Sequence, residues 1–332
     1  MYSAWFDFHG VKVAIRADAD RVAGDLKRDF AYFITGECPP DISVEILFRP
    51  PPYETVPRVR ASRYLPTSIV YDVKGKRYVD YRNRALTVYD HAGQRAQIYS
   101  ADNDLLHEIS YLLVLSRVGE LLDRRGMHRI HGLALSVSGK AVLCLLPMGG
   151  GKTTLALELL KQDGIKLLSD EIILVDRSGA VLPFPMRLGI DKEDAPVLPP
   201  ELLREFPRQR YGTKILLDID HISGKVGSAG APWLILIGER VFSDETKVEP
   251  MGRMSAFRFL FRDGVIGLGL PQVVEYFLRN GIRDLGKVPI LFSRTLASLK
   301  LLCRSKVYRC LLGRDKKKNA ETIAGILTKS HE

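Results

Sequence analysis

The residues with the clearest capacity for chemistry form a glycine-rich loop at 146–154, Leu-Pro-Met-Gly-Gly-Gly-Lys-Thr-Thr. An apolar run at 141–145 precedes this loop, and a helix-forming run at 155–160 follows it. Three consecutive glycines have no Cβ, so the backbone can bend tightly and bring its N–H groups close to phosphate oxygens. A helix that begins near Lys152 would point the positive end of its dipole at the same anion. Strand, glycine loop, Lys-Thr and helix in this order predict a phosphate cradle.

The polar residues of the loop have predicted tasks in binding a nucleotide. Lys152 would reach the β- and γ-phosphates, and the Thr153 hydroxyl would bind Mg²⁺. The predicted nucleotide-binding residues are Gly149, Gly150, Gly151, Lys152, Thr153 and Thr154. Leu146 stands where the usual pattern has a glycine, so the loop must begin differently, with Pro147 restricting φ. A glycine-rich hairpin followed by a chance Lys-Thr is the structural alternative.

Two adjacent carboxylates, Asp170 and Glu171, follow a short predicted strand at 165–168. Only eighteen positions separate Lys152 from Asp170, which leaves room for one helix and one strand that returns to the phosphate end. Adjacent side chains on a strand point to opposite faces, so at most one carboxylate can aim at the γ-phosphate unless the strand ends there. One carboxylate would hold Mg²⁺ and the other would accept the proton of the acceptor hydroxyl. The residue types do not decide between these two roles, and a solvated acidic turn is the structural alternative.

Composition limits the class of protein. The chain has 332 residues, 46% of them hydrophobic, which predicts a globular protein with one large domain or two medium ones. Its net charge of +10 permits an acidic partner, because a basic surface attracts anions at long range. Lysines and arginines are spread widely and no RNA- or DNA-binding motif is recognisable, so we expect no nucleic-acid partner.

Cysteine usage and hydropathy predict the cellular compartment and whether the chain has a membrane segment. The four cysteines show no CxxC spacing, and reduced thiols in the cytoplasm are the simplest interpretation. The N-terminus carries Asp7 and His9 in place of an apolar signal core. No apolar run approaches the roughly 20 residues that a membrane helix needs, so we expect no membrane segment.

Periodicity predicts the elements that must position these residues. In the first part of the chain we expect a hairpin at 2–17, a helix at 18–34, a strand at 42–48, a meander of short strands at 68–73, 78–81, 86–89 and 96–100, and a long helix at 103–125. Further on we expect strands at 133–137, 141–145, 165–168, 172–175, 181–184, 214–219, 233–237 and 306–312, helices at 255–261, 272–280 and 319–327, and an exposed loop with a short helix at 196–206. The strand that enters the glycine loop is thus the second arm of a tight hairpin, whereas in an ordinary doubly wound protein it would be parallel to its neighbours.

These elements suggest a division of the chain. We expect a small β-rich α+β domain with a β-meander at 1–101, a connecting helix at 102–126, and a nucleotide-binding catalytic domain at 127–332. Helix-rich C-terminal segments with leucines allow a homo-oligomer but do not require one.

The order and spacing of His131-Gly132, the hairpin, the glycine loop with Lys152 and Thr153, and the Asp170-Glu171 pair resemble the HPr kinase/phosphorylase family. These are serine kinases whose catalytic core is related to phosphoenolpyruvate carboxykinase. The resemblance covers roughly residues 127–190, with a fainter echo at 314–323. It implies an α/β fold with a mixed-sheet P-loop kinase core of the HPr kinase/phosphoenolpyruvate carboxykinase type, in a branch distinct from the sugar-regulatory enzyme.

The resemblance also implies roles for single residues. Asp170 would be the catalytic base and Glu171 the metal-side group, with Thr153 and either carboxylate as metal ligands. His131 would lie in the active site, where it could polarise the transferring phosphoryl group. Arg187 is a candidate electrostatic clamp on the transition state.

Two departures from the family pattern carry hypotheses of their own. Glu171 stands where a second Asp is common, and the acidic residue expected just before 186–190 is absent. The missing acidic residue predicts a single metal site and a weak reverse, phosphorolytic reaction.

The predicted function is therefore an ATP- and Mg²⁺-dependent kinase that phosphorylates a hydroxyl, most simply a serine on a small protein or peptide, for which an acidic acceptor is compatible. A small-molecule kinase or carboxykinase-like enzyme is one alternative, and a non-catalytic nucleotide-sensing module is another. A basic cluster at Arg314 and 316–318 is interpreted as a solvated loop, with a phosphate contact as the alternative.

Overall fold

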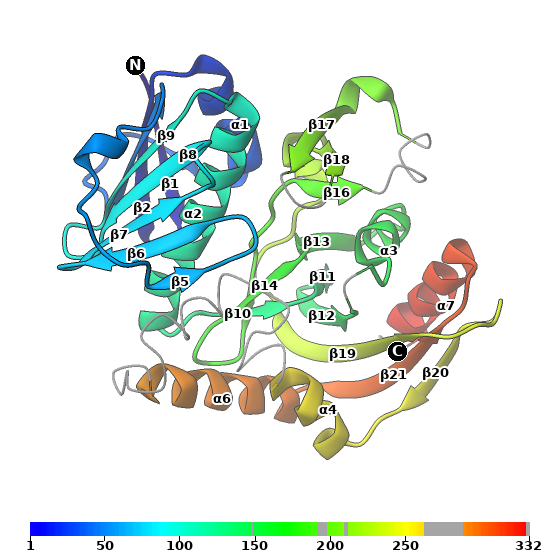
Figure 1. Ribbon diagram of the computed structural model, residues 1–332. Coiled ribbons are helices and arrows are strands. Elements are labelled where there is room, and N and C mark those ends of the chain that lie inside the picture. Colours follow the sequence, from blue (N-terminus) through cyan, green and yellow to red (C-terminus); the bar gives the residue numbers. More distant parts are fainter. Residues whose placement is uncertain (148, 191–197, 209–211, 262–287, 330–332) are drawn as a thin grey trace. The chain divides into compact units, whose positions relative to one another are not determined.

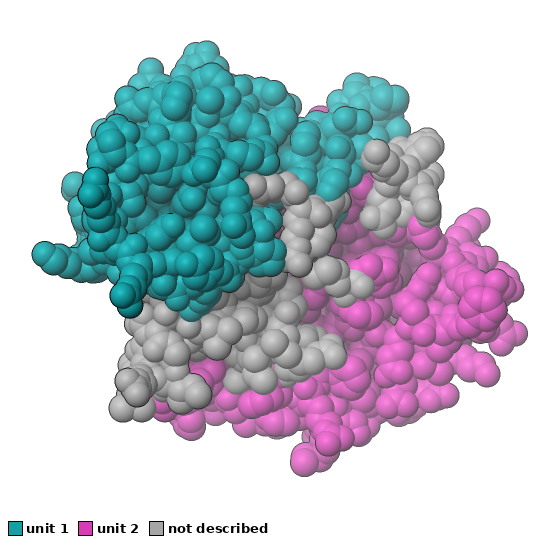
Figure 2. Space-filling model, viewed as in Figure 1, with its two compact units in different colours: residues 1–118, 191–220 teal, residues 119–190, 221–332 magenta. Residues whose placement is uncertain are grey.

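A computed structural model describes residues 1–147, 149–190, 198–208, 212–261 and 288–329. The protein is a mixed α/β structure with several sheets (Figure 1). The chain forms two compact units (Figure 2): unit 1 comprises residues 1–118 and 191–220, and unit 2 comprises residues 119–190 and 221–332. The domain boundaries expected at 101 and 126 stay a prediction.

Unit 1 is built on one large sheet. The strands of this sheet are β1 (Tyr2–Phe8), β2 (Val11–Ala17), β3 (Ile34–Thr35), β4 (Ile42–Phe48), β5 (Arg63–Tyr64), β6 (Ile69–Val73), β7 (Lys76–Asp80), β8 (Ala85–Asp90) and β9 (Arg95–Ser100). Unit 1 also contains β17 (Leu203–Arg208) and β18 (Gly212–Leu217), which pair with each other outside the large sheet. Its helices are α1 (Asp20–Asp29), the first part of α2 (Asn103–Arg124), and the short η1 (Ala31–Phe33), η2 (Tyr53–Thr55) and η4 (Pro200–Leu202). The predicted hairpin, the strand at 42–48, the meander and the long helix are all present.

The large sheet has the order β3-β1-β2-β4-β9-β8-β7-β6-β5. Strands β6 to β9 form the expected antiparallel meander, whereas β4 is parallel to both β2 and β9. Aromatic rings pack the core beneath β1, where Phe30 contacts Phe6 and Phe8 edge-on and stacks on Tyr111 of α2. These contacts explain why the alternating residues of β1 and β2 lie on a buried face.

A buried ionic cluster holds the 198–220 segment to the rest of unit 1. Arg204 of β17 donates to Asp29 of α1 and, at 2.7 Å, to Asp218. His107 of α2 contacts Asp29 at 2.7 Å, and Phe206 packs edge-on against the His107 ring. Burial acts to lower the pKa of Arg204, but the Asp29 and Asp218 carboxylates outweigh it and raise that pKa above its usual value. The segment predicted as an exposed loop at 196–206 therefore contains a strand as well as the short helix η4.

Among the residues that the structure describes, unit 2 contains two sheets, the separate strand β16, the end of α2 and four α-helices of its own. Its strands are β10 (His128–His131), β11 (Leu133–Val137), β12 (Lys140–Leu145), β13 (Ile165–Ser169), β14 (Ile172–Val175), β15 (Val181–Leu182), β16 (Leu188–Ile190), β19 (Ala231–Arg240), β20 (Lys247–Pro250) and β21 (Lys306–Leu312). Its helices are α3 (Lys152–Leu159), α4 (Arg253–Leu260), α6 (Val288–Cys303) and α7 (Lys316–Lys329). Helix α6 was not predicted, and the helix expected at 272–280 lies outside the described residues.

The main sheet of unit 2 has the order β13-β11-β12-β19-β21-β20. Strands β11 and β12 form the predicted antiparallel hairpin, and β13 pairs antiparallel with the other side of β11. Strands β12, β19 and β21 are parallel to one another. The sheet is therefore mixed, and the strand that enters the glycine loop has one antiparallel and one parallel neighbour.

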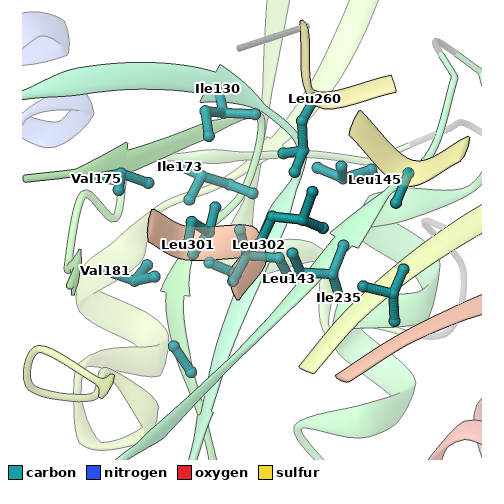
Figure 3. Packing of buried hydrophobic residues seen from close by; sticks show 14 of the residues in the cluster. Ile130, Leu143, Leu145, Ile173, Val175, Val181, Ile235, Leu260, Leu301 and Leu302 are labelled. Atoms are coloured by element: carbon teal, nitrogen blue, oxygen red, sulfur yellow. The ribbon is translucent and has the colours of Figure 1, made fainter. Parts of the chain in front are cut away.

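One hydrophobic core covers this sheet (Figure 3). Leu143 and Leu145 of β12, Ile235 of β19 and Ile173 of β14 contribute to it together with Leu301 and Leu302 of α6 (Figure 3). Cys144 is also buried, and its pKa is raised by burial, as expected for a cysteine that packs as a small apolar side chain. All four cysteines are free thiols.

Candidate functional site

Strand direction brings the predicted site residues to one edge of the main sheet of unit 2. Strands β12 and β13 are both antiparallel to β11, which lies between them, so β12 and β13 run in the same direction. Their C-terminal ends therefore lie at the same edge as the N-terminal end of β11. The glycine loop follows β12, Asp170 follows β13, and His131-Gly132 precedes β11. Three segments that are distant in sequence thus meet at a single edge.

The glycine loop makes a tight turn at this edge. Gly149 and Gly151 have positive φ of 72° and 84°, a conformation that glycine adopts at no steric cost. The N–H of Gly150 donates to the Pro147 carbonyl at 3.0 Å, and a Cβ at Gly150 would meet that oxygen at 2.9 Å. Gly151 is the left-handed N-cap of α3, so the first turn of that helix begins at Lys152. Met148 lies outside the described residues.

Packing accounts for the unusual Leu146. This side chain is buried and contacts Gly238 of β19, where an added Cβ would stand 2.2 Å from a Leu146 methyl group. At this position the chain therefore lacks the conformational freedom of a glycine, and the apolar Leu146 side chain holds the start of the loop against β19. Pro147, which follows it, fixes the direction in which the chain leaves the sheet.

The Lys152 side chain is folded over the loop that it would serve. It is buried, and its Nζ donates to the carbonyls of Leu146 at 3.0 Å and Pro147 at 3.1 Å. Both carbonyls belong to the loop itself, so the ammonium group lies within the bend of the backbone. Anionic oxygens form stronger hydrogen bonds with an ammonium group than neutral carbonyls do. A phosphate could therefore compete for these donors.

Asp170 and Thr153 contact each other directly. The Thr153 hydroxyl donates to Oδ2 of Asp170 at 2.7 Å, and Asp170 is buried. This bond joins the first turn of α3 to the end of β13. The structure thus brings Lys152, Thr153 and Asp170 together, the three residues on which the predicted chemistry depends most.

Glu171 differs from Asp170 in its surroundings. Its side chain is exposed, and its backbone has a φ of 71°, which places it in a left-handed turn between β13 and β14. Its carbonyl accepts hydrogen bonds from the Gly132 N–H at 3.2 Å and from Nδ1 of His131 at 3.1 Å. The two carboxylates therefore diverge, because the strand ends at Ser169.

His131 lies beside this acidic turn. Because a carbonyl only accepts, the bond to Glu171 makes Nδ1 the donor and leaves Nε2 as the acceptor of the neutral ring. Gly132 fits closely behind it, since a Cβ there would meet Ile173 and Leu145 at under 3 Å. The His-Gly pair is thus fixed by both neighbouring strands.

Arg187 and Thr154 lie in segments that neighbour these residues in the fold. Arg187 is half-buried in the segment between β15 and β16, and α3 packs against β16. That segment is anchored by the Phe184 N–H, which donates to Leu168 of β13 at 2.8 Å. Thr154 is half-buried in the first turn of α3. The predicted roles of both residues remain predictions.

The basic cluster after β21 lies at the same edge of the sheet, because β21 is parallel to β12 through β19. Arg314 forms a two-pronged ion pair with Asp244 at 3.0 and 3.1 Å and covers the ring of Phe242. Asp315 caps α7 by accepting from the N–H groups of Lys317 and Lys318. Helix α7 packs beside α3 (Figure 1). The cluster is therefore an ordered helix start, and its relation to phosphate stays a prediction.

His128, at the other end of β10, belongs to a different group that the sequence did not reveal. Its Nδ1 lies 2.9 Å from Asp123 of α2 and its Nε2 lies 2.8 Å from the Ser293 hydroxyl of α6. Arg294 holds both oxygens of Asp123, at 3.0 and 2.8 Å. Burial would raise the pKa of Asp123, but the Arg294 charge and the His128 hydrogen bond outweigh it and hold that pKa below its usual value.

This Ser-His-Asp geometry has the distances of a nucleophilic triad but lacks its surroundings. Ser293 lies within α6, where backbone N–H groups bond along the helix and so cannot form an oxyanion hole. Asp123 is neutralised by Arg294, which is fully buried. We therefore interpret the group as a structural polar cluster that joins α2, β10 and α6. The one sequence signal for it, an Arg and a Ser on the apolar 288–303 run, becomes visible only once that run is known to be a helix.

Among the described residues, no group of three or more His, Cys, Asp or Glu side chains forms a ready metal site. No helix in the described part of the chain is long and apolar enough to cross a membrane.

Comparison with known proteins adds little. The sequence matches no known family in a scan against family descriptions, and it matches no curated protein. Among solved structures, the chain is similar to "Structure of the Hpr(Ser) kinase/phosphatase from Coxiella burnetii", with 13% sequence identity and a TM-score of 0.26. That similarity covers 61% of this chain and 95% of the other. A likeness at this level decides neither family nor function, so both rest on the residues of the site.

Proposed function

We propose that the protein is an ATP- and Mg²⁺-dependent kinase with a P-loop core, which transfers the γ-phosphoryl group of ATP to a hydroxyl. The observation that carries the proposal is the meeting of Lys152, Thr153 and Asp170 at one sheet edge, with Thr153 Oγ1 2.7 Å from Asp170 Oδ2. An ammonium group, a hydroxyl and a carboxylate around a glycine turn are the groups that phosphoryl transfer requires.

Magnesium fits the donor set at this edge. Thr153 and Asp170 offer two oxygen atoms within hydrogen-bonding distance of each other, and Mg²⁺ prefers oxygen ligands from one or two carboxylates together with substrate phosphates. The ion would be held by Thr153 and by a carboxylate of the 170–171 pair. When bound, it supplies charge neutralisation for the phosphate oxygens.

The chain's own residues would then act as follows. Lys152 would exchange its bonds to the Leu146 and Pro147 carbonyls for phosphate oxygens, and the N–H groups of the glycine turn would bind the same oxygens. Asp170 would accept the proton of the acceptor hydroxyl as that oxygen attacks. His131, whose Nδ1 donates to the Glu171 carbonyl, would polarise the transferring phosphoryl group.

The acceptor in this proposal is a serine of a small protein or peptide. The positive net charge of the chain favours an acidic acceptor over a basic one. A small-molecule kinase is the second candidate, because the same edge would serve a small alcohol equally well.

Transfer of label from γ-³²P-ATP in cell extract tests the proposal. We expect the purified protein to label a polypeptide, and Lys152→Ala to abolish labelling and weaken nucleotide binding. Lys161→Ala is the matched control, since Lys161 is an exposed lysine of the same region that pairs with Glu158, and it should label as the wild type does.

Other outcomes separate the alternatives. Label in a low-mass product would favour the small-molecule kinase. Tight ATP binding without any transfer, in a protein with an intact Asp170, would overturn the kinase proposal in favour of a nucleotide-sensing module.

A further inference from the structure

Basic residues are concentrated in one part of unit 1. Residues 49–84 contain nine Lys or Arg and only three Asp or Glu, so this stretch carries +6 of the chain's net charge of +10. It includes the proline-rich segment at 50–57 and strands β5, β6 and β7. Residues 300–318 form a second basic stretch, with eight Lys or Arg and one Asp, so charge alone does not single out residues 49–84 and the sheet edge there has to be considered as well.

Two of the three acidic residues in this stretch are engaged within it. Asp72 binds Arg77 with both oxygens, at 2.8 and 3.1 Å. Asp80 accepts from the Tyr53 hydroxyl and from the Asn83 N–H, both at 2.9 Å. Within the described part of the chain, no carboxylate forms an ion pair with Arg58 or Arg60. Their positive charge therefore faces solvent.

These arginines lead directly into a sheet edge. Strand β5 ends the nine-stranded order and is paired antiparallel with β6, with Tyr64 opposite Ile69 (Figure 1). The Ser62 N–H continues the pairing by donating to Val70 at 2.8 Å. A strand at the end of a sheet presents backbone groups to which an extended chain can add.

Side chains along this edge alternate in exposure. Arg60, Ser62 and Tyr64 are exposed, whereas Ala61, Arg63 and Leu65 are half-buried. Arg58 and Val59 precede them and are exposed as well, and Tyr64 is 74% exposed. An extended chain repeats its side chains on one face about every 6.6–6.8 Å. Acidic residues at every second position of an added strand would therefore match the spacing of Arg58 and Arg60.

We propose that the edge formed by residues 58–64 docks an acidic, extended segment of the acceptor protein. The identification of the partner as the acceptor rests on the proposed kinase function, whereas the docking itself does not. Two exposed arginines supply charge, Tyr64 supplies an amphipathic aromatic contact, and β5 supplies the pairing edge; Arg and Tyr are residue types enriched at interfaces.

A polypeptide fits this edge better than a single-stranded nucleic acid does. Sequence-tolerant nucleic-acid binding uses several aromatic side chains on which successive bases stack. Here one exposed tyrosine accompanies a row of alternating side chains beside an edge strand, which is the arrangement for strand addition.

The test is binding of a fluorescein-labelled peptide, (Glu-Val)₅, to the full-length Asp170→Asn protein without nucleotide, measured by anisotropy. We expect binding that weakens at least tenfold in Arg58→Glu/Arg60→Glu and that weakens further as salt rises. A (Gln-Val)₅ peptide and an N-methylated (Glu-Val)₅ peptide should bind at least tenfold more weakly, because the first lacks charge and the second lacks backbone donors.

The matched control is Lys247→Glu/Lys306→Glu, which makes the same change in charge on β20 and β21 at an edge of the other sheet. Both lysines are exposed. We expect this variant to bind the acidic peptide within twofold of the wild type. Equal losses in the two double variants would overturn the proposal, because net charge alone would then explain binding.

Three further outcomes decide between the proposals. Tighter binding of a labelled oligonucleotide than of the acidic peptide at the same edge would overturn the choice of partner. Once an acceptor is labelled by the wild-type protein, Arg58→Glu/Arg60→Glu should raise its KM and leave kcat unchanged; an unchanged KM would overturn docking while the kinase stands. Peptide binding at this edge in a protein that transfers no phosphate would leave docking intact and end the kinase proposal.

Discussion

Strand β10 has a histidine at each end, and the two belong to different kinds of site. His128 joins Asp123 and Ser293 in a buried group in which Arg294 neutralises the carboxylate. His131 lies beside the acidic turn, near the edge where Lys152 bonds to carbonyls and Asp170 to a hydroxyl. The four residues of β10 thus begin at a structural polar cluster and end at a candidate active site.

The two groups differ in whether a ligand could replace the contacts that the charged side chains make. The Arg294 guanidinium is 0% exposed, and Asp123 compensates its charge. Removing Asp123 would therefore destabilise the folded state, so this group favours one arrangement of α2, β10 and α6. The contacts of Lys152 and Asp170 with neutral carbonyls and a hydroxyl can be replaced by phosphate oxygens and a metal ion. A buried His-Asp-Arg group therefore indicates stability here, whereas the meeting of Lys152, Thr153 and Asp170 at a strand edge supports the proposed chemistry.

The sharpest test of the comparison is Asp170→Asn. Asparagine keeps an oxygen that can accept from Thr153 but loses basicity, so we expect transfer to fall by about 10²–10⁴-fold, the usual contribution of a general base. Nucleotide binding, measured by titration calorimetry, and the urea midpoint should stay near those of the wild type. Retained transfer would show that the base is another residue.

Asp123→Asn should have the opposite profile. It replaces the carboxylate that buried Arg294 holds with a neutral amide, and we expect the free energy of unfolding to fall by about 3–5 kcal/mol. Asp104→Asn is the control on the same helix, because its ion pair with Arg21 is solvent-exposed and such pairs contribute about 0.2–1 kcal/mol. Urea unfolding measures both, and equal effects would contradict a structural role for Asp123.

Acid should reduce the contribution of Asp123 to the free energy of unfolding. Since the pKa of Asp123 is held below its usual value, the unfolded chain binds more protons than the folded one as the pH falls below the ordinary aspartate pKa of about 3.9. The contribution of Asp123 is thus present at neutral pH and is lost on acidification. Urea midpoints should fall more steeply between pH 5 and pH 3 in the wild type than in Asp123→Asn; parallel slopes would exclude Asp123 as a source of the acid sensitivity.

Glu171→Gln should have the smallest effect. The Glu171 carbonyl, which accepts from His131 and Gly132, is unchanged by this substitution, and the side chain is exposed, so stability should change by less than about 0.5 kcal/mol. If Glu171 contributes to magnesium binding, the concentration of Mg²⁺ for half-maximal transfer should rise with kcat little changed. A loss of transfer as large as that of Asp170→Asn would reverse the roles assigned to the two carboxylates.

Much of the local structure followed from short-range signals. The hairpin at 133–145, the tight glycine turn before Lys152, the start of α3 and the strand that ends just before Asp170 were predicted from glycine positions and apolar runs. Each depends on residues within a few positions of one another, so steric and hydrogen-bonding preferences of the backbone are sufficient. The strand at 203–208 and helix α6 were missed because their apolar faces become apparent only against partners elsewhere in the chain.

By itself, the sequence determined the candidates for the proposed chemistry: a glycine-rich turn, a lysine and a threonine at the start of a helix, and a carboxylate one helix and one strand later. Tertiary structure decided which of these residues meet, because strand order places β11 between β12 and β13 and thereby brings their ends to one edge. It also decided that Leu146 anchors on Gly238 and that Asp123 pairs with a residue 171 positions away. No local pattern encodes contacts over that separation, since their energy appears only when the core around them has formed.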